Sequence, residues 1–126
     1  MSALAANDAD DVVVLVVEDE IMVRFDVANC LEDAGYIVIQ AASGKAAIAL
    51  CNSDAPIDMV ITDINLGGSA SGWDVAERFR TVRPGVPVIY TSGKSLDRER
   101  CVAGSVFVTK PYASNDILEA CQRLAR

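Results

Sequence analysis

The sequence contains no histidine among its 126 residues. This absence excludes Ser-His-Asp and Cys-His nucleophilic triads, histidine-ligated zinc or haem, and phosphohistidine chemistry within the chain. Positive charge is also scarce, because 11 basic side chains face 18 acidic ones and leave a formal net charge of −7. Nucleic-acid surfaces need clustered lysine and arginine, so we expect no nucleic-acid partner. Any chemistry must use carboxylates, lysine, hydroxyls, thiols or a metal ion.

The sequence also lacks cysteine motifs, a secretory signal and a long apolar run. No two of its four cysteines have the spacing of a metal site or a redox motif. Each cysteine lies among apolar neighbours, so we expect small core residues rather than a disulfide framework. These cysteines are Cys30, Cys51, Cys101 and Cys121. Residues 1–11 have no basic start and no useful apolar stretch, and the longest apolar run, 12–17, is too short to cross a bilayer. We therefore expect a cytoplasmic protein that does not contact membranes.

Apolar runs of strand length alternate with segments of helical periodicity along the chain. The expected strands are residues 12–17, 36–41, 57–62, 86–90 and 106–108. The expected helices are residues 20–34, 43–52, 73–82 and 115–124, with Gly35 as a helix stop and Ser43 and Ser114 as N-caps. This alternation predicts one α/β domain, residues 12–126, with a parallel sheet and helices on both faces. Residues 1–11 are expected to form a flexible acidic tail.

Four of the five apolar runs end in polar residues that are suited to chemistry. These residues are Glu18 and Asp19, Asp63, Thr91, and Thr109 with Lys110. Ligand sites of open α/β sheets lie beyond the carboxyl ends of the strands, so we expect these side chains to meet at one edge. Taken singly, the acids would more often cap helices and the threonine would be structural. The joint arrangement favours a functional site.

Three neighbouring carboxylates need positive charge. Two unit charges 4 Å apart repel by about 4 kcal/mol at an effective dielectric constant near 20. Lys110 supplies one positive charge, and Mg²⁺ suits the remainder because it binds carboxylates, waters and phosphate oxygens. Lysine and threonine are suitable partners for phosphoryl oxygens, and a carboxylate facing them could act as a nucleophile that forms an aspartyl phosphate.

The segments VVEDE, ITDINL, YTSG and VTKPY resemble those of bacterial response-regulator receiver domains, in the same order and at almost the same spacing. The resemblance covers about residues 12–125. It implies a flavodoxin-like, doubly wound (βα)5 fold with a five-stranded parallel sheet in the order 2-1-3-4-5. It also implies a role in two-component signal transduction.

The resemblance assigns a role to each polar residue. It implies that Asp63 is the phosphoacceptor, that Asp19 binds Mg²⁺ directly, that Glu18 binds it through water, and that Asn65 offers its backbone carbonyl. It further implies that Thr91 and Lys110 bind the phosphoryl group. Thr91 and Phe107 would be the switch residues, and the Lys110–Pro111 bond would be cis, as X-Pro bonds can be.

Three features depart from the family pattern. Glu18 stands where aspartate is commoner. Leu66-Gly67-Gly68 replaces the Met-Pro that follows the phosphoacceptor, with one extra residue before Gly72, which predicts a more mobile loop. The stretch between Thr91 and Lys110 is about one helical turn short, so we expect a stunted fourth helix within residues 92–104.

We expect a stand-alone receiver that takes a phosphoryl group from a histidine kinase or a histidine phosphotransfer protein onto Asp63, with Mg²⁺ as cofactor. It would catalyse only its own phosphorylation and dephosphorylation. Because no DNA-binding segment follows residue 126, its output would be contact with a downstream protein, or phosphorelay.

Four alternatives remain open. The chain could be a receiver excised from a hybrid kinase or longer regulator, although Met1 and the natural-looking tail favour an intact chain. A haloacid-dehalogenase-like phosphohydrolase would need an aspartate at Asn65 and a longer chain. A pseudo-receiver that only binds partners would not need Asp63, Thr91 and Lys110 together. A flavodoxin would need a phosphate loop where residues 18–20 are acidic.

Overall fold

The computed structural model describes residues 11–93 and 100–124, which contain one five-stranded parallel sheet. The sheet has the order β2-β1-β3-β4-β5, which confirms the predicted flavodoxin-like topology. The strands are β1 (Val13–Val17), β2 (Ile37–Ala41), β3 (Met59–Asp63), β4 (Val88–Ser92) and β5 (Val106–Thr109). The helices are α2 (Ile21–Asp33), α3 (Gly44–Cys51), α4 (Gly72–Val82) and α5 (Ser114–Leu124).

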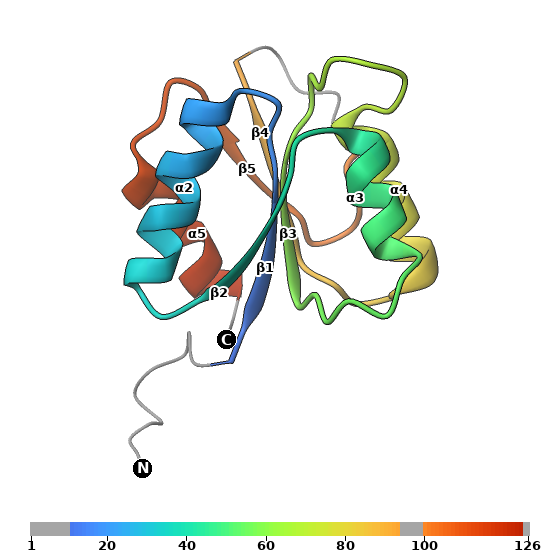
Figure 1. Ribbon diagram of the computed structural model, residues 1–126, viewed down its shortest axis with the longest axis horizontal. Helices are drawn as coiled ribbons and strands as arrows, with labels where there is room; N and C mark the ends of the chain where they lie inside the picture. The colour runs from blue at the N-terminus through green and yellow to red at the C-terminus, as the bar shows by residue number, and fades with distance from the viewer. Residues whose placement is uncertain (1–10, 94–99, 125–126) are drawn as a thin grey trace.

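The sheet separates two layers of helices. Helices α2 and α5 cover one face, and α3 and α4 cover the other (Figure 1). Successive side chains of β1 point to opposite faces, as in any strand. Val14 and Val16 therefore pack in the core under α2 and α5, whereas Leu15 and Val17 pack in the core under α3 and α4. Because both faces of the central strands are covered, β1, β3 and β4 are buried along their whole length.

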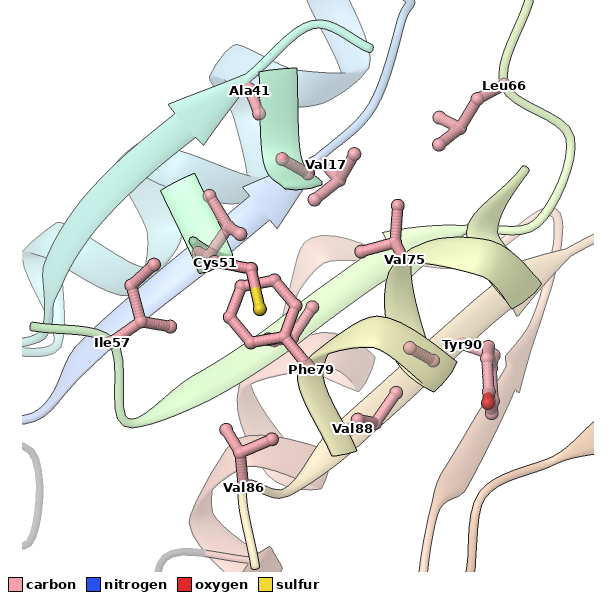
Figure 2. Close-up of a cluster of buried hydrophobic side chains, with 14 of the residues drawn as sticks. Val17, Ala41, Cys51, Ile57, Leu66, Val75, Phe79, Val86, Val88 and Tyr90 are labelled. Carbon is pink, nitrogen blue, oxygen red and sulfur yellow. The ribbon is translucent and has the colours of Figure 1, made fainter. Parts of the chain in front are cut away.

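The core under α3 and α4 is centred on Phe79, whose side chain is fully buried. Figure 2 shows this ring beside Cys51, with Ile57 and Val86 at the amino-terminal side of the sheet. Cys51 and Cys121 are buried as predicted, whereas Cys30 and Cys101 are partly exposed, and none of these four described cysteines forms a disulfide.

Several expected helix ends are confirmed. Helix α2 ends at Asp33, and Gly35 follows with φ of 101°, a backbone conformation that glycine adopts without strain. The Ser43 hydroxyl accepts a hydrogen bond from the Ala46 N–H, which makes Ser43 the N-cap of α3. The prediction for Ser114 was wrong, because α5 begins at this residue. The N–H of the preceding Ala113 instead donates to the Asp116 carboxylate.

Two strands begin two residues later than predicted from the sequence. The third begins at Met59 rather than residue 57, and the fourth at Val88 rather than residue 86. Pro87 has no N–H to donate, so Val86 and Pro87 precede the β4 ladder. The later ends place Asp63 and Thr91 inside strands, where they are aligned with each other in the register of β3 and β4.

The expected tail, residues 1–11, lies outside the described residues except for Asp11. Residues 94–99, within the segment 92–104 that was expected to hold a stunted fourth helix, also lie outside them. No helix in the described part of the chain is long and apolar enough to cross a membrane.

Candidate functional site

The strand ends bring the predicted site residues to one edge of the sheet. The Lys110 ammonium group lies 2.8 Å from Asp63 Oδ2 and 3.4 Å from Glu18 Oε1. Lys110 is held in place by its backbone, because its N–H donates to the carbonyl of Ser92 and so extends the pairing of β4 with β5. Residues that are separated by up to 92 positions in the sequence therefore form one ionic cluster.

Three carboxylates of this cluster could hold a metal ion. One oxygen from each of Glu18, Asp19 and Asp63 lies within 4.8 Å of the other two. Glu18 and Asp63 are only 3% and 5% exposed, whereas Asp19 is exposed to solvent. A set of carboxylate oxygens open to water on one side fits a hard divalent cation such as Mg²⁺, which keeps several of its waters.

The turn that carries the acidic pair is fixed by its own hydrogen bonds. The Glu18 N–H donates to the carbonyl of Ala41, and the Glu20 N–H donates to Glu18 Oε2 at 3.0 Å. Arg24, one turn into α2, donates from Nη1 to the Glu18 carbonyl at 2.8 Å and from Nε to Gln40 Oε1 at 3.1 Å. These contacts tie the acidic turn to both β2 and α2.

The surroundings shift the acid–base properties of the cluster. Burial raises the pKa of Glu18, and the charge of Asp63 adds to this effect. The pKa of Asp19 is lowered, chiefly because the Gly67 N–H donates to Asp19 Oδ2 at 3.2 Å. Partial burial alone would lower the pKa of Lys110, but its hydrogen bond and ion pair with Asp63 outweigh burial and raise it. Lys110 is therefore a cation at neutral pH.

Asn65 and Thr91 lie next to Asp63, whereas Phe107 lies on β5, which β4 separates from the strand of Asp63. The Asn65 N–H donates to Asp63 Oδ1 at 3.2 Å. The Thr91 side chain is buried and interacts with the side chain of Tyr112. Phe107 is partly buried, pairs with Tyr90 in the register of β4 and β5, and packs against the core under α3 and α4. The Lys110–Pro111 peptide bond is cis, as the family resemblance implied.

Three residues that contact the ionic cluster or its neighbour Thr91 were not expected from the sequence. Arg24 contacts the acidic turn, Gly67 contacts Asp19, and Tyr112 contacts Thr91. Tyr112 stood within the VTKPY segment, and Gly67 stood where the family's proline is missing. No sequence pattern indicated a role for Arg24. Its contact with the Glu18 carbonyl depends on the first turn of α2, which brings the two residues together.

A groove of about 390 Å³ lies between α2 and the start of α5 and reaches Lys110. Its lining combines apolar side chains such as Val27 and Tyr112 with the acidic Glu20 and Asp26. Three large apolar residues of α2 (Ile21, Met22 and Phe25) are 45–70% exposed. The ionic cluster therefore lies next to an accessible surface that is partly apolar.

A family model described as the response regulator receiver domain matches residues 14–122. Among curated proteins, the chain is 32% identical over 123 residues to the probable transcriptional regulatory protein TcrX of Mycobacterium tuberculosis, covering 94% of this chain and 52% of that protein. It is 30% identical over 125 residues to the alkaline phosphatase synthesis transcriptional regulatory protein SphR of Synechococcus elongatus, covering 90% of this chain and 48% of that protein. The chain thus spans about half the length of these curated relatives.

Two solved structures show the same similarity over nearly the whole of the matched chain. A response regulator receiver protein from Sinorhizobium medicae is 34% identical with a TM-score of 0.86, covering 90% of this chain and 94% of that chain. The chemotaxis protein CheY4 of Vibrio cholerae is 27% identical with a TM-score of 0.79, covering 90% of this chain and 98% of that chain.

Proposed function

The chain belongs to the response regulator receiver domain family of two-component signalling, and from this we propose that it accepts a phosphoryl group on Asp63. The observation that carries the proposal is the cluster at the carboxyl edge of the sheet, in which Asp63 is paired with Lys110 and lies beside two further carboxylates. Receiver domains act as phosphoacceptor switches rather than as enzymes with a separate substrate.

The proposed donor is a phosphohistidine of a histidine kinase or histidine phosphotransfer protein, because this chain has no histidine. A carboxylate oxygen of Asp63 attacks the phosphorus, the new P–O bond forms as the P–N bond breaks, and the departing imidazole takes up a proton from solvent. Hydrolysis later transfers the phosphoryl group to water and restores the carboxylate. Self-catalysis of both steps is part of the proposal.

We propose that Glu18, Asp19, Asp63 and the backbone carbonyl of Asn65 hold the Mg²⁺ ion. When bound, the ion neutralises negative charge between the carboxylates and the incoming phosphoryl oxygens. The Lys110 ammonium group, now paired with Asp63, pairs with a phosphoryl oxygen as well. These charges make approach of an anionic donor to an acidic pocket feasible.

Phosphorylation is proposed to switch the protein through Thr91 and Phe107. In the resting structure the Thr91 side chain interacts with Tyr112. A phosphoryl oxygen on Asp63 offers the Thr91 hydroxyl a charged acceptor, which makes a stronger hydrogen bond. Movement of Thr91 changes the packing of the neighbouring strand β5. Phe107 on that strand then changes its position against the core under α3 and α4, which alters the surface there.

The proposed partners are proteins. The groove beside Lys110 and the exposed side chains of Ile21, Met22 and Phe25 support docking of the phosphodonor next to Asp63. The output is proposed to be contact with a downstream protein or phosphorelay, in the cytoplasm. The net charge of −7 favours a protein over a nucleic acid as the direct partner of this domain.

Incubation with Mg²⁺ and acetyl phosphate, followed by intact-mass spectrometry, tests the proposal. The protein should gain one phosphoryl group, whereas Asp63→Asn and the protein in excess EDTA should gain none. A phosphoryl group on Asp63→Asn would overturn the assignment of the acceptor. Steady release of phosphate from a generic phosphate ester would instead support a phosphohydrolase.

A further inference from the structure

The loop between β3 and α4, residues 64–71, is anchored on both sides of Gly67. The Leu66 side chain is buried in the core under α3 and α4. Ala70 packs against the start of α3 so closely that a Cβ built on Gly44 would lie 2.5 Å from the Ala70 carbonyl oxygen. Ser71 is the N-cap of α4 and forms a capping box with Asp74. The position of the Gly67 amide is therefore set by the packing of its neighbours.

This amide is directed at the most exposed carboxylate of the acidic cluster. The Gly67 N–H donates to Asp19 Oδ2 at 3.2 Å, across 48 positions of sequence. Glu18 and Asp63 are held by burial, whereas the Asp19 side chain is exposed and would otherwise sample several rotamers. The hydrogen bond leaves Asp19 Oδ1 and the second lone pair of Oδ2 available to a cation.

We propose that the Gly67 backbone amide is a positioning group, which holds Asp19 in the orientation that binds the divalent cation. The inference rests on the proposed function, because it assumes that Asp19 is a metal ligand. Hydrogen bonds from outside a metal's own ligands fix the orientation of those ligands, and their loss typically weakens metal binding 10- to 100-fold.

The contact depends on a feature that distinguishes this chain. Gly67 stands where the family pattern has the proline of Met-Pro, and proline has no N–H to donate. A receiver with proline at this position lacks the donor that Gly67 provides. The Leu66-Gly67-Gly68 loop thus adds a contact to Asp19, rather than only adding freedom to the backbone.

The decisive comparison is between Gly67→Pro and Gly67→Ala. Proline removes the N–H, whereas alanine keeps it, and a Cβ at this position would lie 3.5 Å from Asp19 Oδ2, an ordinary van der Waals contact. Mg²⁺ affinity is measured by NMR titration of backbone amides near Asp63, without any phosphodonor. We expect Gly67→Ala to bind like the unchanged protein and Gly67→Pro to bind about tenfold more weakly. Equal affinity, or tighter binding by Gly67→Pro, would overturn the inference.

A second measurement uses the unchanged protein and does not depend on folding of the proline variant. The exchange of the Gly67 amide proton with water is followed by NMR, with and without saturating Mg²⁺. A positioning role predicts that the amide stays protected when the metal is bound, and loss of protection would overturn it.

Failure of the unchanged protein to bind Mg²⁺ would instead overturn the proposed metal site. Binding with equal affinity in Gly67→Pro would overturn only the role of Gly67.

Discussion

Lys110 Nζ lies 2.8 Å from Asp63 Oδ2, although Asp63 is the last residue of β3, Lys110 follows β5, and β4 lies between these two strands in the sheet. The lysine reaches across because its backbone continues the pairing with Ser92 and its side chain is only about one quarter exposed. It is the cation that balances the acidic cluster within the described residues. This ion pair neutralises the charge of Asp63 in the resting structure. It also places a positive charge where the phosphoryl oxygens would lie.

Replacing Lys110 by methionine should separate these two effects. A unit positive charge ~5 Å from a divalent ion opposes its binding by about 2 kcal/mol at the dielectric constant of water, so Lys110→Met should bind Mg²⁺ more tightly, by about tenfold. The same variant should accept less phosphoryl group from acetyl phosphate, because no ammonium group pairs with the phosphoryl oxygens. NMR titration and intact-mass spectrometry measure the two properties.

Arg123→Met is the matched control for net charge. Arg123 is exposed in the last turn of α5, which runs antiparallel to the strands and ends at the opposite edge of the sheet. This variant should keep the Mg²⁺ affinity and the phosphorylation of the unchanged protein. A loss of both Mg²⁺ binding and phosphorylation in Lys110→Met would contradict the expected division of roles.

Glu18→Gln should stabilise the protein in metal-free buffer with EDTA, increasingly so as the pH rises. Burial raises the pKa of Glu18 in the folded state, so the folded state binds its proton more strongly than the unfolded state does. The ionised group therefore lowers the free energy of unfolding at pH values above its ordinary pKa of 4.5. This decrease reaches its full size once the pH exceeds the pKa of Glu18 in the folded state. Glutamine avoids this loss because it carries no charge.

Thermal unfolding of both proteins, from about pH 4 to 8, measures this difference in stability. This range includes the pH values at which proteins are usually most stable. The midpoint of Glu18→Gln minus that of the unchanged protein should grow with pH. Added Mg²⁺ should reverse the order, because the metal stabilises the protein that binds it. A midpoint difference that shrinks as the pH rises would show that the folded protein stabilises the charged form of Glu18, and the expected effect of burial would be wrong.

Phe79→Ala should destabilise the core that supports the site. The ring is fully buried beside Cys51 at the centre of the core under α3 and α4 (Figure 2). Large-to-small changes of this kind cost about 3–5 kcal/mol of unfolding free energy, because they remove apolar contacts and leave a cavity. Urea unfolding measures this free energy.

Val82→Ala on the same helix is the control for Phe79→Ala. Val82 is 42% exposed, so its substitution should change the unfolding free energy by no more than about 0.5 kcal/mol. Equal effects of the two variants would mean that the packing around Phe79 contributes little.

The sequence predicted a parallel α/β sheet, the helix stop at Gly35 and the meeting of Glu18, Asp63 and Lys110, because these depend on apolar periodicity, glycine signals and strand direction. The order of the strands, in contrast, was implied by the family resemblance. It did not predict the contact between Gly67 and Asp19. That contact depends on where burial of Leu66 places the next amide, and a loop rich in glycine carries no periodicity that would show it. Composition alone indicated a mobile loop there.

The start of β4 was misplaced for a comparable reason. Val86 continues an apolar run, yet the ladder begins at Val88 because Pro87 interrupts the donors. The Ser114 cap was misplaced because Asp116, three residues after Ala113, accepts the hydrogen bond from the backbone there. In both places a local hydrogen-bond donor or acceptor decided a boundary that apolar patterning could not locate.

Tyr112→Phe should favour the phosphorylated conformation. The Tyr112 side chain interacts with the buried Thr91 in the resting structure, and we expect a hydrogen bond between their hydroxyls that is lost when Thr91 moves. Removing the Tyr112 hydroxyl destabilises the resting state by about 1 kcal/mol, the usual net value of a hydrogen bond, and leaves a state in which Thr91 bonds a phosphoryl oxygen unaffected. Beryllium trifluoride, a phosphoryl mimic, should therefore bind Tyr112→Phe with Mg²⁺ about fivefold more tightly, measured by NMR titration.

A double-mutant cycle isolates this effect from general destabilisation. In a Thr91→Val background the hydroxyl pair is already absent, so adding Tyr112→Phe should leave the affinity for the mimic unchanged. The same gain in both backgrounds would mean that Tyr112 acts through another contact, such as the lining of the groove beside Lys110. A loss of affinity in Tyr112→Phe alone would mean that the tyrosine hydroxyl supports the switched state, and the direction proposed for Thr91 would then be wrong.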